Sequence, residues 1–474
     1  MKKNVLIIAL MFFAVIATNA QTPILKSGIK LENIGKIKTL KASEIKESYL
    51  GIGCEVLDRD FVNYDSYKEY LGDLGVKHAR FQSGWAKTEK QKGVYDFAWL
   101  DTVIDDCRGR SIQPWINIVY GNSIYGGGGD MQSSSSIPTS EVALQAWDKY
   151  VRTLVNHFRT RNFEWEIWNE IDHHIYKGST AEEYAVFFIR TAEVIREVQP
   201  EGKIIALALT FPGATEFVRG FLDSMKEKGK LHLIDKVSFH GYPKNPDADL
   251  KKTQELIDLL KQYDERIVAF QGETGCPSTE ADWKRPYTEL TQAKWDLRRA
   301  LSHIGRGIRF SLFTISDFSY LGDKLNTKGK LKVDKNMNVV YAKQSYYAYQ
   351  NLTSLFDSSL KATDPEALSI KVDSNSVVYA FVGENNNLSV VAYWNSKNPP
   401  SKSLATRDFL LTIQRAKIKS PVLVDVRTGM VYQLPESNIK NVGKGVEYKV
   451  PVYDSPMILC GKEFLEKRGL LKFD

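Results

Sequence analysis

The chain has 474 residues and a net charge of +7, and it contains 43% hydrophobic and 26% charged residues. This balance is typical of a soluble globular protein with a substantial core, and the length leaves room for an α/β barrel of about 250 residues plus a further domain. The positive charge is spread thinly and forms no basic block, which argues against nucleic acid as a partner.

The first twenty residues have the pattern of a secretory signal peptide. Two lysines precede an apolar run from Val5 to Ile16, and the small residues that end at Ala20 predict cleavage after that position. The apolar run is too short for a comfortable membrane span, and no later segment is long and apolar enough for one. We therefore expect a periplasmic or secreted protein without a membrane span.

From residue 48 to residue 350 one unit repeats eight times. A short apolar or β-branched run ends in polar or aromatic residues, and a stretch with helical spacing follows. The runs are "YLGIGCEVL", "VKHARFQ", "QPWINIVYG", "FEWEIWNE", "KIIALALT", "KVSFHGYP", "RIVAFQGETG" and "IRFSLFTISDFS". Eight alternating strand and helix units predict a (β/α)8 TIM barrel, an α/β fold, over residues 48–350.

After residue 350 the pattern changes to short alternating runs such as "SVVYAFVG" and "LSVVAYWNS". Turn residues separate these runs, and no convincing helix intervenes before the end. The pattern predicts a C-terminal antiparallel β-sandwich over residues 351–474. The N-terminal segment, residues 21–47, can add a strand to this domain.

One connection in the barrel is unusual. The segment "GNSIYGGGGDMQSSSSIPTS" (121–140) follows the third strand and holds four consecutive Gly and four consecutive Ser. It fits either a flexible surface loop or a loop that covers the substrate, because long loops on this face often carry binding roles.

The chemistry of such a barrel lies at the C-terminal ends of its strands. Polar side chains fall at these predicted ends, and they exceed what helix capping requires. They are Arg80, Asn117, Asn169, Glu170, His240, Tyr242, Glu273 and Asp317.

Two of these residues are carboxylates at the ends of the fourth and seventh strands. Glu170 ends "FEWEIWNE" and Glu273 lies in "FQGETG", so both are expected at one mouth of the barrel. A lone Glu at a strand end is most often a cap or an ion-pair partner. Two carboxylates that face each other across a cleft can instead break a glycosidic bond, one as a proton donor and the other as a nucleophile.

The two carboxyl groups then need different environments. We expect Trp165 and Trp168 to disfavour the charge of Glu170, and we expect Arg80 and Tyr242 to keep Glu273 ionised. Asn169, beside the acid, is well placed for a sugar 2-hydroxyl. His240 fits either a buried core histidine or a residue that lines the sugar subsite.

The motifs "EIWNEID" and "FQGETG" resemble clan A of the glycoside hydrolases, which are retaining (β/α)8 enzymes. Within that clan the chain is most similar to family 39, which includes β-xylosidases and α-L-iduronidases. The segment "ARFQSGWAKTEKQKGVYDFAWLD" (79–101) resembles the second strand of that family and the loop and helix after it, and "FTISDFS" resembles its eighth strand, with Asp317 in the matching place. The resemblance implies that Glu170 is the acid/base and Glu273 the nucleophile.

The sequence also departs from the pattern of the clan. Ile171 stands where Pro usually follows the Asn–Glu pair, and Leu312 or Phe313 stands where many members have a Trp on strand eight. That Trp commonly forms the floor of the subsite for the cleaved sugar. The catalytic pair is intact, but activity on xylosides is not implied.

These observations favour a secreted retaining glycosidase that acts on an oligo- or polysaccharide. We expect no cofactor and no metal, because carboxylates and water suffice and Cys54, Cys107, Cys276 and Cys460 lack metal spacing. These cysteines are expected to be free buried thiols. Two alternatives remain: an endo-acting polysaccharide hydrolase with the same residues, and a carbohydrate-binding protein without catalysis, against which the presence of both Glu argues.

Overall fold

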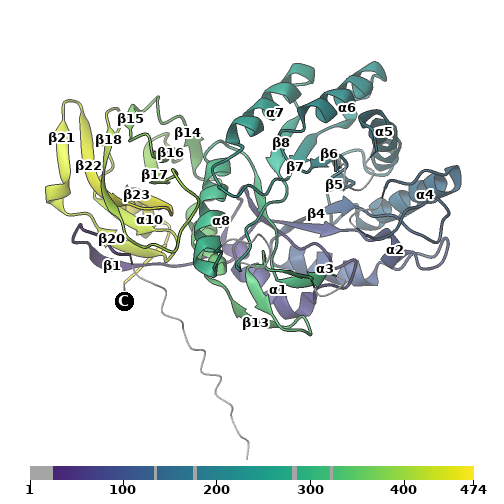
Figure 1. Cartoon of the computed structure of the whole chain (residues 1–474), viewed down its shortest axis with the longest axis horizontal. Coiled ribbons are helices and arrows are strands. Elements are labelled where there is room, and N and C mark those ends of the chain that lie inside the picture. The colour runs from purple at the N-terminus through teal and green to yellow at the C-terminus, as the bar shows by residue number, and fades with distance from the viewer. Residues whose placement is uncertain (1–24, 133–135, 174–178, 280–285, 321–323, 474) are drawn as a thin grey trace, which may run out of the picture.

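The structure is a computed structural model that describes residues 25–132, 136–173, 179–279, 286–320 and 324–473. The predicted signal peptide lies outside these ranges. Among the helices within them, none has the length and apolar character needed to cross a membrane. The described chain forms a barrel and a β-sandwich that lie side by side (Figure 1).

The barrel consists of eight parallel strands in one closed ring, which confirms the predicted (β/α)8 fold. Each strand pairs with the next, and the last pairs with the first. The strands are β2 (Leu50–Gly53), β3 (His78–Gln82), β4 (Gln113–Ile118), β5 (Glu164–Ile167), β6 (Lys203–Leu209), β7 (Lys236–Phe239), β8 (Val268–Gln271) and β9 (Phe310–Leu312). Each of the eight runs identified in the sequence contains one of these strands.

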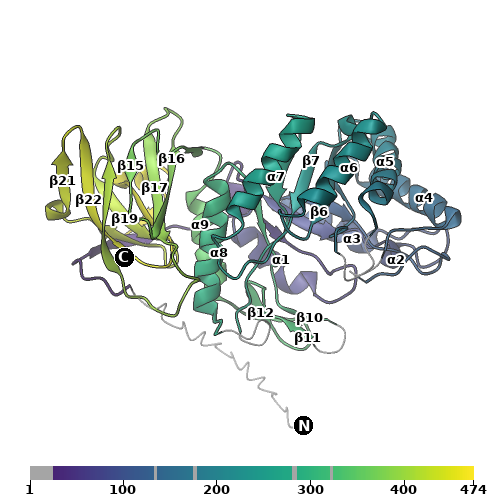
Figure 2. The same ribbon diagram turned by 45° about the horizontal axis from the view of Figure 1, so that its top comes forward.

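Helices surround this ring (Figure 2). They are α1 (Tyr64–Asp73), α2 (Trp85–Thr88), α3 (Ala98–Gly109), α4 (Glu141–Phe158), α5 (Ala181–Val198), α6 (Thr215–Glu227), α7 (Leu250–Tyr263), α8 (Glu289–Ile304) and α9 (Gln344–Leu355). Helix α5 illustrates how the local sequence sets them. Thr180 and Glu183 form a reciprocal capping box at its start, and Tyr184, Phe188 and Ile195 are buried on one face.

The second part contains two antiparallel sheets, which confirms the predicted β-sandwich. One sheet has the order β14-β16-β17-β23-β19-β20-β1-β24 and the other β15-β18-β22-β21. Their strands are β1 (Glu32–Ile37), β14 (Lys361–Thr363), β15 (Ile370–Lys371), β16 (Ser376–Val382), β17 (Leu388–Asn395), β18 (Arg407–Ile413), β19 (Pro421–Asp425), β20 (Met430–Gln433), β21 (Ile439–Val442), β22 (Gly445–Val452), β23 (Met457–Gly461) and β24 (Leu471–Lys472). Strand β1, from the segment 21–47, pairs with β20 and β24.

The structure corrects one expectation for this region, where no helix was foreseen. Helix α10 (Lys462–Lys467) follows β23 and buries only Leu465, so it is too short to give a periodic pattern. Two hairpins that the sequence did not indicate also follow β9: β10 (Phe318–Tyr320) with β11 (Lys324–Asn326), and β12 (Leu331–Val333) with β13 (Val339–Ala342).

Helix α8 stands between the barrel and the sandwich (Figure 1). Its polar side chains are buried because both flanks are covered. Lys294 Nζ forms an ion pair with Asp454 of the sandwich at 2.6 Å, and Arg298 Nη1 donates to the carbonyl of Asn398 at 3.0 Å. The charged side chains of this helix therefore join the two parts.

The four cysteines are all free and buried, as expected. Most of the tryptophans that the structure describes also belong to the core. The fully buried ones are Trp85, Trp115, Trp147, Trp165, Trp168, Trp295 and Trp394. The aromatic content therefore reflects a large aromatic core more than a sugar-binding cleft.

Candidate active site

Glu170 and Glu273 come together with His240 at the carboxyl ends of β5, β8 and β7. One carboxylate oxygen of each Glu and a ring nitrogen of His240 all lie within 4.8 Å of one another. His240 Nδ1 is 3.0 Å from Glu170 Oε1 and 3.7 Å from Glu273 Oε2. The imidazole therefore lies between the two carboxylates, at the bottom of the site and fully buried.

Glu273 is held as a carboxylate by its neighbours. Arg80 Nη1 donates to Oε2 at 2.7 Å, and the Tyr242 hydroxyl donates to Oε1 at 2.5 Å. Burial would raise the pKa of Glu273, but the charges of His240 and Arg80 and the Tyr242 hydrogen bond outweigh it, so the pKa is lowered. These are the contacts expected for Glu273, and they suit an ionised nucleophile.

Glu170 lies on the segment that follows β5, and its side chain is 26% exposed. Its backbone amide donates to the carbonyl of Ala208 at the end of β6, at 2.9 Å, and its φ of 49° is left-handed. This backbone conformation is uncommon outside Gly and concentrates at functional sites. The carboxyl group is thus presented to the cleft by a turn that β6 holds in place.

The side chains of Trp165 and Trp168 do not lie beside the carboxyl group of Glu170, where they were expected. Trp165 donates to Gln199 Oε1 at 2.7 Å, and Trp168 packs against Trp147 and Phe187, with ring centroids 5.8 and 5.7 Å away. Trp165 therefore lies on the outer face of β5, opposite the acidic side chain of Glu166. Trp168 follows the strand, and its left-handed φ of 67° breaks the alternation, so its ring also packs among the helices. The prediction was wrong because both rings point away from the barrel interior.

Asn169 lies between Glu170 and the arginine. Its Oδ1 accepts from Arg80 Nη2 at 2.9 Å. This contact orients the amide and leaves its nitrogen as the group that can donate to a sugar hydroxyl. The geometry is compatible with the predicted contact to a 2-hydroxyl.

Two predicted substrate-binding residues have structural contacts instead. Asn117 is fully buried and donates through Nδ2 to the carbonyl of Trp168 at 2.6 Å, so it supports the segment that carries Glu170. Asp317 is 1% exposed and forms an ion pair with Lys343 at 2.6 Å. The structure does not bring Asp317 to the carboxylate cluster, because the chain after β9 turns into the two hairpins.

Two further carboxylates reach Arg80 that were not among the predicted site residues. Glu166, on the inner face of β5, contacts Arg80 Nε at 2.7 Å, and Glu55, just after β2, contacts Nη1 at 3.3 Å. Both side chains are at most 2% exposed. The position of Glu55 directly after "GIGC" was the available signal, since the other site residues also follow strands.

A hollow of about 480 Å³ opens between the segments that follow β5 and β6. Its wall includes Asp172, His173 and Phe211, and the Phe211 side chain is 40% exposed. Asp172 accepts hydrogen bonds from the backbone amide and hydroxyl of Thr210, at 2.9 and 2.7 Å. These bonds tie the two strand ends together and fix the shape of the hollow.

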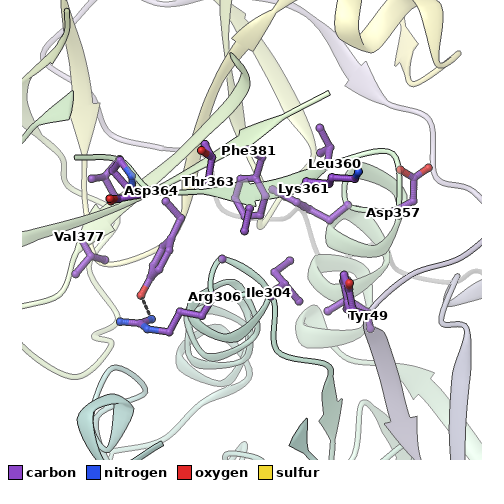
Figure 3. A pocket seen from close by; sticks show the side chains of 18 of the residues that line it. Tyr49, Ile304, Arg306, Asp357, Leu360, Lys361, Thr363, Asp364, Val377 and Phe381 are labelled. Carbon is purple, nitrogen blue, oxygen red and sulfur yellow. Dashed lines mark hydrogen bonds between the residues drawn. The ribbon is translucent and has the colours of Figure 1, made fainter. Parts of the chain in front are cut away.

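A larger cavity of about 790 Å³ lies at the other end of the barrel (Figure 3). Its wall includes Tyr49, at the start of β2, and Arg306, which precedes β9, together with residues of the sandwich such as Phe381. Arg306 donates to the hydroxyl of Tyr379 across the junction. This cavity belongs to the contact between the two parts and holds none of the carboxylate cluster.

The described part of the segment 121–140 is anchored to the barrel. Tyr125 stacks on Trp85 with a centroid distance of 5.6 Å and donates to Glu89 Oε1 at 2.5 Å. Residues 133–135, within the Ser run, lie outside the described chain. A role in covering the substrate stays a prediction.

Among the described residues, Glu170, His240 and Glu273 are also the group whose ligand atoms are close enough to hold a cation. Such an ion would lie beside the guanidinium of Arg80, and both oxygens of Glu273 already accept hydrogen bonds. The donor set therefore suits proton transfer better than metal binding.

Comparison with known proteins agrees with this geometry. Residues 76–264 match the family model described as glycosyl hydrolases family 39. No curated protein sequence matches the chain.

Several solved structures share the fold. A family 39 glycoside hydrolase from the gut symbiont Bacteroides cellulosilyticus WH2 is 17% identical, with a TM-score of 0.68 over 90% of this chain and 83% of that one. A monomeric β-xylosidase from Caulobacter crescentus CB15 is 16% identical (TM-score 0.59, 91% and 98% covered), and a family 39 enzyme from Xanthomonas axonopodis pv. citri is 14% identical (TM-score 0.59, 94% and 99% covered). Residues 76–264 thus resemble the glycosyl hydrolases of family 39, and the chain shares the fold of solved enzymes of that family. Together these findings support a glycoside hydrolase, and so a carbohydrate substrate.

Proposed function

We propose that this protein is a secreted hydrolase that cleaves O-glycosidic bonds of an oligo- or polysaccharide by double displacement. The observation that carries the proposal is the approach of a Glu170 oxygen to within 4.8 Å of a Glu273 oxygen. Retaining enzymes hold their two carboxyl groups about 5 to 5.5 Å apart, whereas inverting enzymes need roughly 6.5 to 9.5 Å to admit a water molecule. The short approach favours retention.

In the first step the Glu273 carboxylate attacks the anomeric carbon. The bond from that carbon to the glycosidic oxygen breaks, and the proton of Glu170 moves to the leaving oxygen. Arg80 and Tyr242 keep Glu273 ionised before the attack. The product is a glycosyl ester on Glu273 and a released alcohol.

In the second step Glu170, now a carboxylate, removes a proton from water. The water oxygen attacks the anomeric carbon, and the ester bond breaks to release the Glu273 carboxylate. Tyr242 donates to the oxygen that regains negative charge, which stabilises this departure. Two inversions at one carbon give net retention.

The leaving group is proposed to occupy the hollow between β5 and β6. Glu170 protonates the leaving oxygen, and His173, which lines the hollow, donates its backbone amide to the Glu170 carbonyl at 3.0 Å. The exposed ring of Phe211 offers an apolar platform for the face of a sugar. A hollow on this side supports a saccharide leaving group.

Secretion rests on the sequence of residues 1–20, with its basic start, apolar run and small residues before the cleavage position. The sugar remains to be identified by assay. The Caulobacter relative is a β-xylosidase, but Leu312 or Phe313 stands where many clan members have Trp, so the resemblance alone does not imply activity on xylosides.

The test is a screen over aryl glycosides and polysaccharides, with sizing of the products and proton NMR of the first anomer formed. Retained configuration and loss of several orders of magnitude in rate for a folded Glu273→Gln variant are expected. An inverted product would rule out double displacement. Binding of saccharides without any hydrolysis would instead support the carbohydrate-binding alternative.

A further inference from the structure

The buried charges around Arg80 do not balance. Three carboxyl groups, those of Glu55, Glu166 and Glu273, contact this one guanidinium at 3.3, 2.7 and 2.7 Å. The side chains of Arg80, Glu55 and Glu166 are at most 2% exposed. An unpaired buried charge is costly, so a proton on one of the three carboxyl groups lowers the free energy of the cluster.

Glu55 is the carboxyl group with the least support for a negative charge. Glu166 also accepts from the Ser238 hydroxyl, and Glu273 also accepts from Tyr242. Glu55 makes the longest of the three contacts, and its Oε2 is buried with no hydrogen-bond partner in the described chain. Burial raises the pKa of Glu55 to about 8, Arg80 opposes that rise, and the charge of Glu273 adds to it.

The backbone is shaped to accept this carboxyl group. A Cβ on Gly53 would lie 2.2 Å from Glu55 Oε2 and 2.6 Å from Oε1. Glycine at this position therefore lets the side chain of Glu55 fold back over β2 toward Arg80. The contact is built into the end of the strand.

We propose that Glu55 is a positioning residue for the nucleophile: its neutral acid form leaves Arg80 to Glu273, and its ionised form competes for the same guanidinium nitrogen and repels Glu273. This inference rests on the proposed role of Glu273. It predicts a second, alkaline control on activity that does not involve proton donation by Glu170.

Other ionisable groups lie in or beside this cluster. They are Cys54, Tyr67, Arg80, Glu166, His240, Tyr242 and Glu273. Burial raises the pKa of the Cys54 thiol and the Tyr67 hydroxyl well above the ordinary values, so both stay neutral. Burial lowers the pKa of His240, but Glu273 and Glu170 outweigh that effect and raise it, so the imidazole is a second titrating group of this site. The experiment must therefore detect a carboxyl group directly.

The test is an infrared titration of the full chain between pH 6 and pH 10, following the band of protonated carboxyl groups. Glu170→Gln is the matched control, since it removes the carboxyl group of the proposed proton donor. We expect a protonated carboxyl group that is lost with a midpoint near 8 in wild type and in Glu170→Gln, and that is missing in Glu55→Gln. A band with a midpoint near 8 that persists in Glu55→Gln, or the absence of a band with that midpoint in Glu170→Gln, overturns the inference; Asp296, whose pKa burial raises to about 6, accounts for a band lost at lower pH. If Glu55→Gln does not fold, the Glu170→Gln spectrum alone decides.

A kinetic readout separates this inference from the proposed function. On a dinitrophenyl glycoside, whose leaving group needs no proton, wild-type kcat/KM should fall by about tenfold between pH 7 and pH 9, as for a single titrating group with a midpoint near 8. The ratio of kcat/KM between pH 9 and pH 7 should stay within about twofold of one in Glu55→Gln, because its amide cannot ionise. An unchanged ratio in wild type contradicts the inference. Absence of hydrolysis on every glycoside contradicts the proposed function. In that case the infrared titration still tests whether Glu55 is the group that titrates.

Discussion

Replacing Tyr242 by Phe keeps the ring and removes the hydroxyl that donates to Glu273, the proposed nucleophile. The hydroxyl donates to Glu273 Oε1 at 2.5 Å, in a site where the Phe313 ring packs edge-on against Tyr242 with a centroid distance of 6.3 Å. Hydrogen bonds to charged groups are worth about 1.5 to 3 kcal/mol. At 1.4 kcal/mol per factor of ten, their loss corresponds to about ten- to hundredfold in a rate that depends on them.

The two chemical steps use this bond differently. In the second step Glu273 regains its charge as the ester breaks, so Tyr242 stabilises the transition state and its loss slows that step. In the first step the charge is present beforehand and decreases, so the loss is smaller. Tyr242→Phe should therefore lower kcat by about ten- to hundredfold on substrates limited by the second step, with a smaller change in kcat/KM.

The pH dependence of kcat/KM tests the role of Tyr242 independently, through the direction in which its acid limb moves. The hydrogen bond from Tyr242 favours the ionised form of Glu273 and helps to lower its pKa. Without it that pKa rises, and the acid limb of kcat/KM moves to higher pH. Stopped-flow and steady-state assays on one aryl glycoside across the pH range measure both effects.

Tyr349→Phe is the matched control. Tyr349 is a fully buried tyrosine whose hydroxyl donates to the carbonyl of Gly51 at 2.9 Å and not to a carboxylate. Its loss should cost about 1 kcal/mol of stability and leave the acid limb in place. Equal losses of kcat and kcat/KM in Tyr242→Phe, with an unmoved acid limb, would refute the assigned role.

Three other variants test the remaining assignments. Glu170→Ala should lose far more rate on poor leaving groups than on activated aryl glycosides, and added azide should yield a glycosyl azide of retained configuration; similar losses on both substrates would argue against Glu170 as the acid. Phe211→Ala should weaken kcat/KM on saccharide leaving groups by about tenfold, taking roughly 1 kcal/mol or more for a lost ring contact, with little change on small aryl glycosides, and the reverse order would place the leaving group elsewhere. Asp317→Ala should destabilise the fold by about 3 to 5 kcal/mol in urea unfolding, because Lys343 is left as an unpaired buried charge, while the folded enzyme keeps its KM; a large rise in KM would restore Asp317 as a substrate contact.

Much of the barrel could be predicted from sequence because its signals are local. Each strand run is short, apolar and bounded by polar residues, and eight of them alternate with helical spacing. Pairings across the chain give no such signal: Asn33 of β1 pairs with Tyr432 of β20, and the nearby sequence specifies no partner at that separation. For the same reason the sequence predicted the C-terminal domain only as an antiparallel β-sandwich, and not the order of the strands in its two sheets.

The sequence predicted those site residues that stand at the ends of strands. It was less informative for residues within a strand, whose role depends on whether the side chain points into the barrel or toward the helices. Glu166 and Trp165 are neighbours, and both faces of β5 are buried, one by the barrel interior and the other by helices. The usual rule that apolar residues face the core would place Trp165 inside the barrel and Glu166 outside it. The structure shows the opposite arrangement. Asp317 shows a second limit, since its partner Lys343 lies 26 residues further along the chain and no motif links the two.

The ionic network below the cleft explains why this barrel interior is charged. An apolar set of similar volume would often be as stable as a buried ion pair or more so, so stability alone does not account for Arg80 and its carboxylates. Arg80 contacts Glu166 below and Glu273 above, and Asn169 beside the acid. A single guanidinium thus holds both Glu273, the proposed nucleophile, and Asn169, the residue next to the proposed acid. Preorganised charge of this kind acts without reorganisation during the reaction, and this advantage offsets the cost of burying the network.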